Sequence, residues 1–270
     1  MKDEDKKPPP IVSTKAYDEA SVFIPENLLR EARRQKSIPD GNIPSVCVLD
    51  PDGDILRSLL DRNEGKEHPH WACYHTKLYE FSLDGMTLGI IGFVVGASFA
   101  VLVAEELFAS GCRLLINVTS SGQIVEKEEP PFFLLVDKSL RDEGTSYHYL
   151  PPSDYAHLDE RLLELFEGAF KDSAVPVYRG STWTTDAPFR ETEQAIEHAR
   201  RMGIRAVEME SAALYAFAKA RSKPVVCFAH VTNRMGNVDG DFEKGEASGS
   251  QAALQLIAVA AKAWLSHDET

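Results

Sequence analysis

The apolar residues of this 270-residue chain form short continuous runs that alternate with stretches of helical spacing. Short apolar runs between turn residues are typical of buried strands, whereas apolar residues spaced three and four apart predict amphipathic helices. This pattern predicts strands at residues 45–49, 71–83, 87–95, 113–118, 132–136, 175–178 and 225–231. It predicts helices at residues 25–35, 55–60, 98–110, 158–170, 191–202 and 250–265.

Turn residues mark the boundaries between these elements. Asp50-Pro51-Asp52-Gly53 ends the first strand, Asp84-Gly85 predicts a hairpin turn, and Gly111 stands at a helix C-cap position. Because strands and helices alternate through most of the chain, we expect an α/β fold in which a mixed central β-sheet is flanked by helices. Loops after the carboxyl ends of the strands would carry a functional site in such a sheet.

The first residues differ in composition from the rest of the chain. Charged residues there are followed by Pro8-Pro9-Pro10, so residues 1–20 are predicted to be a flexible N-terminal tail. No repeat or linker is evident after residue 40, and residues 21–270 are therefore predicted to form a single domain.

Bulk composition narrows the class of protein. Apolar residues make up 43% of the chain, and Lys and Arg number 29 against 42 for Asp and Glu, giving a net charge of −13. Phosphates would repel so acidic a chain, so no nucleic-acid partner is expected. No apolar stretch reaches membrane-spanning length and the charged start is unlike a signal peptide, so we expect a cytoplasmic protein without a membrane partner.

Cysteine and cofactor motifs give little indication of chemistry. Cys47, Cys112 and Cys227 lie in or beside apolar runs and are expected to be reduced core residues. No Walker motif or G-x-G-x-x-G occurs, and His68-Pro69-His70 has no Cys or carboxylate at ligand spacing beside it. We therefore expect no cofactor and no metal.

The most informative segment is residues 206–216, where a short apolar strand end continues into a helix. Glu208 and Glu210 lie at this junction, and Leu214 and Phe217 continue at helical spacing. A carboxylate at a helix start is favoured by the helix dipole and accepts hydrogen bonds, so it is suited to gripping a vicinal diol. From the residues alone, an ordinary helix cap is the preferred interpretation of a glutamate in this place.

Glu208-Met209-Glu210-Ser211-Ala212 resembles the signature of the nucleoside phosphorylase family, whose members include uridine phosphorylase and the hexameric purine nucleoside phosphorylases. Three further blocks are similar to that family in order and spacing. Residues 96–107 resemble its Gly-rich turn and Glu-Glu-Leu helix, residues 117–122 fall at its Arg-x-Gly-Thr-Thr-Gly, and residues 231–234 resemble the Val-x-Asn-Arg of uridine phosphorylases. The resemblance covers residues 45 to 265.

The resemblance implies an enzyme that breaks the bond between ribose and a base. Met209 and Glu210 would hold the ribose, with the carboxylate on the 2′ and 3′ hydroxyls and Ser120 nearby. Glu210, Asn233 and Arg234 are the implied catalytic residues. The transition state of such a reaction resembles an oxocarbenium ion, which a nearby negative group stabilises.

Two segments are implied to contact the base. They supply five residues: Ser121, Gly122, Asp186, Phe189 and Arg190. Phe189 would stack on the base and Arg190 would donate to a carbonyl, although a surface ion pair of Arg190 with Glu191 or Glu193 is an open alternative. Purine-specific relatives tend to carry an Asp where Asn233 stands, so the sequence favours a pyrimidine.

The phosphate site departs from the family pattern. The implied positions are Asp50, Asn117 and Ser120, but Asn117 stands where the family has an arginine and Gly53 stands where it has a second. A third arginine, usually given by a neighbouring subunit from near Tyr74, also has no counterpart. Each lost hydrogen bond to phosphate contributes about 1.5–3 kcal/mol.

Three hypotheses follow. The first is that the chain is a uridine-phosphorylase-like pentosyltransferase of nucleotide salvage that takes a nucleoside and phosphate. The alternatives are a hydrolytic nucleosidase that uses water, because the phosphate-binding arginines are missing, and an inactive nucleoside-binding protein. The resemblance also implies a homo-oligomer, either a dimer or a hexamer.

Overall fold

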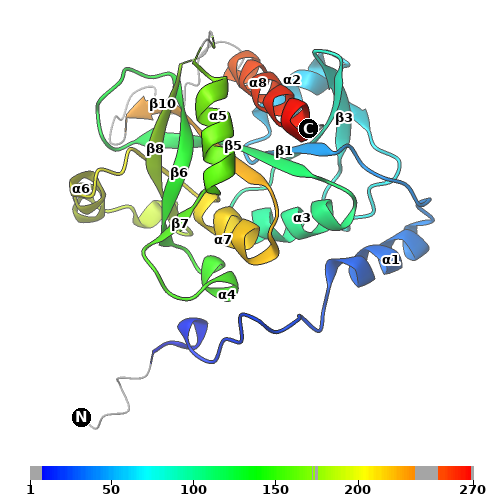
Figure 1. Ribbon diagram of the computed structural model, residues 1–270, viewed down its shortest axis with the longest axis horizontal. Coiled ribbons are helices and arrows are strands. Elements are labelled where there is room, and N and C mark those ends of the chain that lie inside the picture. The colour runs from blue at the N-terminus through cyan, green and yellow to red at the C-terminus, as the bar shows by residue number, and fades with distance from the viewer. Residues whose placement is uncertain (1–7, 172, 174–175, 235–248, 269–270) are drawn as a thin grey trace.

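The structure is a computed structural model that describes residues 8–171, 173, 176–234 and 249–268. Within these residues a mixed β-sheet runs through the molecule (Figure 1). Its strands are β1 (Val46–Asp50), β2 (Lys66–Glu67), β3 (Tyr79–Leu83), β4 (Met86–Gly92), β5 (Leu114–Gln123), β6 (Phe132–Asp142), β7 (Tyr155–His157), β8 (Val177–Thr185), β9 (Ala206–Glu208) and β10 (Val225–Arg234). Val175, the first residue of one predicted strand, lies outside the described residues.

The strands follow the order β10-β6-β8-β9-β5-β1-β4-β3-β2, and β7 pairs with β6. β10 also pairs with β5, so the strands β5, β10, β6, β8 and β9 close into a ring. β1 runs parallel to both β4 and β5, whereas β9 is antiparallel to β5. The sheet is therefore mixed, as the sequence predicted.

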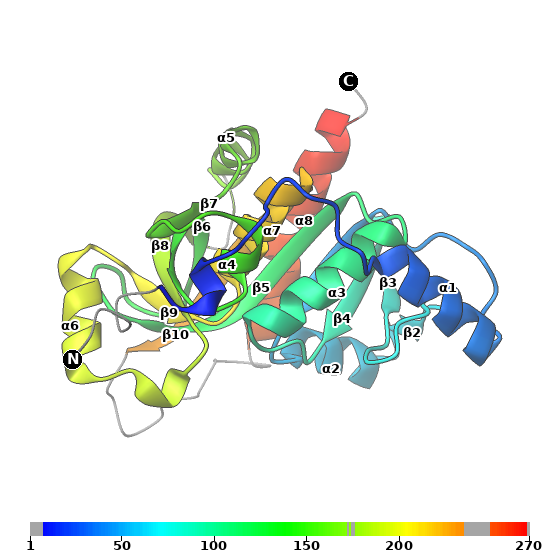
Figure 2. The ribbon, with the colours of Figure 1, turned by 90° about the horizontal axis from the view of Figure 1, so that it is seen from below.

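The helices are α1 (Pro25–Lys36), α2 (Asp54–Asp61), α3 (Ala97–Ala109), α4 (Ser146–Tyr149), α5 (Glu160–Ala169), α6 (Glu193–Arg201), α7 (Ser211–Arg221) and α8 (Ser250–Asp268). Short 3-10 turns occupy Pro10–Val12 and Pro188–Arg190. Helices cover both faces of the central sheet (Figure 2). α7 lies on the face to which Thr119 points, and α5 packs against Phe228 on the opposite face. The predicted α/β class is confirmed.

Side-chain caps explain where two helices begin. Asp159 accepts hydrogen bonds from the backbone N–H of Arg161 at 3.0 Å, so α5 starts at Glu160 rather than at residue 158. Thr192 accepts from the N–H of Ala195 at 3.3 Å and starts α6. Both predicted helices are therefore correct in kind and shifted by about two residues.

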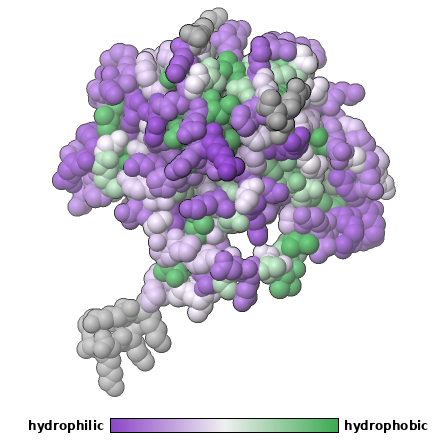
Figure 3. Space-filling view, viewed as in Figure 1, coloured by the Kyte–Doolittle hydropathy of each residue, from purple (hydrophilic) through white to green (hydrophobic). Residues whose placement is uncertain are grey.

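The core lies between the sheet and its helices. All five residues of β1 are buried, and α7 is buried from Ser211 to Ala218, so both segments are enclosed on every side. The face of the molecule in Figure 3 is mostly hydrophilic, in keeping with the charge of the chain. The four cysteines are buried and free, which confirms the predicted reduced core residues.

The sequence underestimated three strands. β5, β6 and β8 extend beyond the predicted strands through polar residues. Thr119 to Gln123 continue β5, because β10 and β9 pair with them on either side. Residues 120–122 therefore belong to the strand.

The segment before α1 crosses the outside of the molecule (Figure 2). Lys15 Nζ lies 2.8 Å from His148 Nδ1, and the Tyr17 hydroxyl donates to the Tyr147 carbonyl at 3.3 Å. The expected flexibility of residues 1–20 stays a prediction, and residues 1–7 lie outside the described residues. Among the described helices, none is both long and apolar enough to span a membrane.

Replacing Tyr215 by Phe is expected to destabilise the fold. The buried Tyr215 hydroxyl donates to the Val136 carbonyl at 2.5 Å and accepts from the Cys227 N–H at 3.1 Å, so Tyr215→Phe leaves two buried backbone groups without their partner. The free energy of unfolding in urea should fall by about 1–3 kcal/mol. Tyr74→Phe removes an exposed hydroxyl bonded to Gln35 and should change little; equal effects of both variants would contradict this account.

Candidate active site

The first turn of α7 is fixed by the carboxylate of Glu208. Its Oε2 accepts hydrogen bonds from the backbone N–H groups of Glu210 and Ser211, both at 2.8 Å. Its Oε1 accepts from the hydroxyls of Thr184 at 2.5 Å and Thr182 at 3.0 Å. Glu208 is thus a buried helix cap anchored to β8, and the capping interpretation is confirmed for this glutamate.

Glu210 lies where three segments meet. Its Oε1 accepts from the backbone N–H of Gly96 at 2.7 Å, and its Oε2 accepts from the Thr119 hydroxyl at 2.7 Å. Gly96 precedes α3, Thr119 belongs to β5, and Glu210 itself is the N-cap residue of α7. The side chain is only 1% exposed, so the carboxylate is enclosed in this structure.

The surroundings of Glu210 favour its protonated form. Burial, followed by the negative charge of Glu208, raises the pKa of Glu210 to about 8, and Asp52 acts in the same direction. The hydrogen bonds from Gly96 and Thr119 oppose this rise only in part. A perturbed carboxyl at the meeting point of several strand ends is a typical feature of a functional site.

The carboxylate retains capacity for a ligand. An ionised carboxylate oxygen accepts two hydrogen bonds, and each oxygen of Glu210 uses one within the protein. One further position on each oxygen matches two neighbouring hydroxyl donors. Displacement of the groups that enclose Glu210 is needed before a ligand reaches it, because its side chain is buried.

Other implied sugar and base residues lie close to Glu210, either next to it in sequence or on β5. Met209 directly precedes Glu210 and is half-buried. Ser120 and Gly122 are half-buried and Ser121 is 5% exposed, all immediately beyond Thr119 on the same strand. Their roles stay predictions, although their position at the strand end agrees with them.

The second base segment lies in the turn after β8. The exposed carboxylate of Asp186 accepts from the Gly144 N–H at 2.8 Å, Phe189 is 98% exposed and Arg190 is exposed. In the described residues no contact joins these three side chains to Glu210. Neighbouring Glu191, whose pKa burial raises to about 7, had not been recognised from the sequence.

The implied catalytic residues of β10 are engaged elsewhere. Arg234 Nη2 donates to both carboxylate oxygens of Glu129 at 2.6 Å, in the loop after β5. Asn233 Oδ1 accepts from the Thr232 hydroxyl at 3.3 Å. The roles proposed for Asn233 and Arg234 stay predictions.

The implied phosphate site is acidic or neutral. Asp50 Oδ2 accepts from the Leu56 N–H at 2.9 Å, so this side chain holds the start of α2. Arg57 Nη1 lies 2.7 Å from Asp54 Oδ1, and Arg57 Cζ lies 4.7 Å from the centre of the Phe93 ring. Asn117 is fully buried. A guanidinium group aimed at Glu210 is therefore not seen among these residues.

Sequence reasoning missed Gly96 and Thr119 as the partners of Glu210. Both stand inside blocks that resemble the family, and Thr119 occupies the position of the first glycine of its Arg-x-Gly-Thr-Thr-Gly block. The hydroxyl side chain at a position where the family has glycine was the signal in the sequence that could have indicated a contact with Glu210. The described residues contain no group of three His, Cys, Asp or Glu side chains placed to hold a metal ion.

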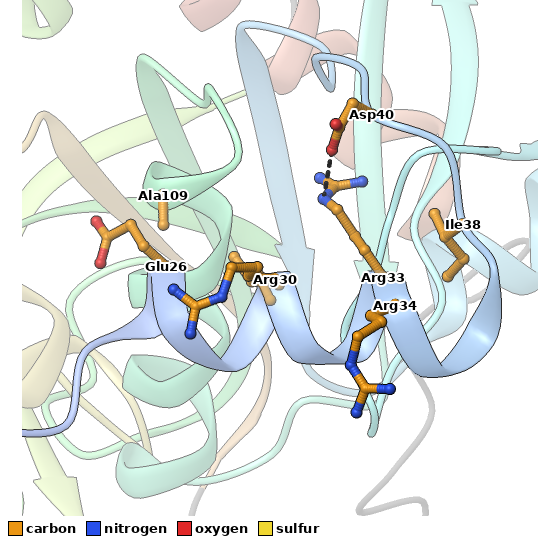
Figure 4. Close-up of a pocket in the computed structure, with 8 residues that line it drawn as sticks. Glu26, Arg30, Arg33, Arg34, Ile38, Asp40 and Ala109 are labelled. Carbon is orange, nitrogen blue, oxygen red and sulfur yellow. Dashed lines mark ion pairs between the residues drawn. The ribbon is translucent and has the colours of Figure 1, made fainter.

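A separate hollow lies beside α1 (Figure 4). Its lining is rich in arginine, and Arg33 pairs there with Asp40 at 3.7 Å. None of the residues that the sequence implied for the site lines this hollow.

Comparison with known proteins identifies the family. The chain belongs to the phosphorylase superfamily, whose family model matches residues 45–264. The membership expected from the four sequence blocks is confirmed.

Individual relatives are distant. The guanosine phosphorylase of Halorubrum lacusprofundi is 26% identical over 226 residues, which cover 81% of this chain and 88% of that protein. The uridine phosphorylase of Thermococcus kodakarensis is 27% identical over 74% of each chain, and the DeoD-type purine nucleoside phosphorylase of Bacillus subtilis is 28% identical over 72% of this chain and 84% of its own. A solved uridine phosphorylase from Vibrio fischeri shares the fold, with a TM-score of 0.66 at 21% identity over 81% of this chain and 90% of that chain.

Glu210 is expected to make stability fall as pH rises. Its folded pKa of about 8 exceeds the ordinary value of 4.5, so its contribution is present below pH 4.5 and is lost as pH rises towards 8. Each pKa unit by which the folded and unfolded states differ corresponds to about 1.4 kcal/mol of stability. Glu210→Gln resembles the protonated side chain, so its free energy of unfolding should exceed that of the wild type at pH 8 and match it near pH 5. Identical pH profiles for both proteins would contradict the raised pKa.

Proposed function

We propose that this chain is an enzyme that cleaves the N-glycosidic bond of a nucleoside, and that Glu210 holds the sugar. The observation that carries the proposal is the position of the Glu210 carboxylate, which is fixed between Gly96, Thr119 and the start of α7. Two acceptor positions on that carboxylate match the 2′ and 3′ hydroxyls of ribose. Membership in the phosphorylase superfamily supports this class of substrate.

The same arrangement suits the chemistry. As the bond from C1′ to the base breaks, positive charge develops on the sugar ring. The buried carboxylate of Glu208 lies at this site and favours that charge, and the developing positive charge in turn favours the ionised form of Glu210, since buried groups interact more strongly than groups in water. Binding the diol also orients C1′ for attack.

A pyrimidine is the base that we propose. Asn233 and Arg234 stand at the end of β10, and an Asn–Arg pair is suited to carbonyl oxygens rather than to protonation of a purine ring. Ser121 and Gly122 at the end of the neighbouring strand β5 lie beside them in register. The relative from Thermococcus kodakarensis, a uridine phosphorylase, supports this choice, while the guanosine phosphorylase relative supports a purine.

The charges around Glu210 favour water as the nucleophile. Glu208 and Asp52 both act on Glu210 with negative charge, and Asn117 is uncharged where the family carries an arginine. A phosphate dianion entering this site meets repulsion, whereas water does not. Hydrolysis is therefore the reaction that we propose first.

Phosphorolysis is the second candidate, because the named relatives are phosphorylases. It requires phosphate to be held by neutral donors such as the Ser120 hydroxyl or by a second subunit. We also propose a homo-oligomer, a dimer or a hexamer, because the resemblance implies one. The cytoplasmic location and a role in nucleoside salvage stay predictions.

Glu210→Ala is expected to abolish base release. The variant loses two hydrogen bonds to a charged group, each contributing about 1.5–3 kcal/mol, so kcat/KM for uridine should fall at least about 100-fold. The matched control is Glu197→Ala on the exposed face of α6, which should retain full activity. Base release by Glu210→Ala at the wild-type rate would remove the sugar contact from the proposal.

The nucleophile is identified by phosphate dependence. Uracil release from uridine is measured in phosphate-free buffer and in phosphate buffer of equal ionic strength, and the sugar product is identified by mass spectrometry. Hydrolysis predicts equal rates and free ribose. A strict need for phosphate with ribose 1-phosphate as the product would establish the second candidate instead.

A further inference from the structure

Asn117 lies beneath the Glu210 site and is fully buried. It belongs to β5 two residues before Thr119, so both side chains point to the same face of the sheet, towards α7. Leu49 of β1 and Cys227 of β10 lie on either side of it in register. The side chain is therefore enclosed between three strands and a helix.

The amide of Asn117 makes no hydrogen bond to any described part of the chain. Neither its Oδ1 nor its Nδ2 has a protein partner, and the hydroxyl of Ser121, on the same face of β5, has none within the described residues either. A buried polar group without a partner lowers the stability of the fold. A polar side chain kept at such a cost is typical of a site with a function.

The side chains nearest Asn117 in register and on α7 include a thiol and a hydroxyl. Burial, together with the charge of Glu208, raises the pKa of the Cys227 thiol well above its usual range, so the thiol stays protonated. The Ser211 hydroxyl, on the first turn of α7, acts on the same thiol and has no hydrogen-bond partner of its own within the described residues. An amide offers donors and an acceptor, and with the hydroxyl of Ser211 it provides the two to four polar partners that a bound water needs.

We propose that Asn117 binds the water molecule that attacks C1′ of the nucleoside. This inference rests on the proposed function and names the residue that handles its nucleophile. The water oxygen forms a bond to C1′ while the bond from C1′ to the base nitrogen breaks. The electron pair of that bond leaves with the base, the water gives up one proton to solvent, and the base takes one from solvent.

The position of Asn117 selects water over phosphate in two ways. Its side chain is uncharged, so it does not offset the charge of an anion beside Glu208 and Glu210. It is also fully buried, and burying an anion costs more free energy than burying a neutral molecule.

The test uses Asn117→Leu, which has nearly the same shape and no polar atoms. Because the variant removes an unpaired buried amide, its midpoint of urea unfolding should rise relative to the wild type. Its kcat for uridine should fall at least tenfold, as expected on losing an oriented nucleophile, while KM stays within about twofold because Glu210 still holds the sugar. If Asn117 served only to stabilise the fold, Asn117→Leu would instead lower the midpoint of urea unfolding.

The control is Ser110→Ala at the end of α3, which removes another buried hydroxyl that lacks a partner in the described residues. This variant should unfold at an equal or higher urea concentration and keep the wild-type kcat. Wild-type turnover in ¹⁸O-labelled water, with phosphate present, should place one labelled oxygen in the ribose.

The outcomes separate this inference from the function on which it rests. Wild-type kcat in Asn117→Leu, or a lower midpoint of unfolding, overturns the role of Asn117 even if nucleosides are cleaved by water. Formation of ribose 1-phosphate without label also overturns it, and leaves nucleoside cleavage intact. Failure of the wild type to release base from any nucleoside overturns both.

Discussion

The structure depends on the cap that Glu208 places on the first turn of α7. This carboxylate satisfies the backbone N–H groups of Glu210 and Ser211 and is itself held by the hydroxyls of two threonines on β8. Without it, the start of a helix that is buried on all sides would carry unpaired donors. The same contact fixes the direction of the Glu210 side chain, so the stability of the helix and the geometry of the site have one origin.

This arrangement places the side chains of Glu208 and Glu210 next to each other in a buried region of low dielectric constant. Hydrogen-bond donors hold the charged side chain of Glu208, whereas burial, followed by the charge of Glu208, raises the pKa of Glu210. A site of this kind is well suited to sugar hydroxyls and to a cationic transition state, and poorly suited to an anion. The charge of the site, rather than its fold, is therefore the property by which we propose that water is preferred to phosphate.

Much of the fold follows from local pattern, because strands such as β1 and β4 are continuous apolar runs that can only be buried. The polar ends of β5 and β8 do not follow, since their pairing depends on strands distant in sequence. Glu210 could be predicted from its junction, whereas its partners could not. Thr119 and Gly96 lie 91 and 114 residues away along the chain, and only the folded sheet brings them to it.

The central claim is that the Glu210 carboxylate contacts both hydroxyls of a ribose. Its most direct test is the affinity of the wild type and of Glu210→Ala for uridine and 2′-deoxyuridine, measured by calorimetry. The account predicts that the wild type binds uridine more tightly and that the variant binds the two nucleosides equally, because the lost hydroxyl and the lost carboxylate are partners. An unchanged preference for uridine in the variant would contradict it.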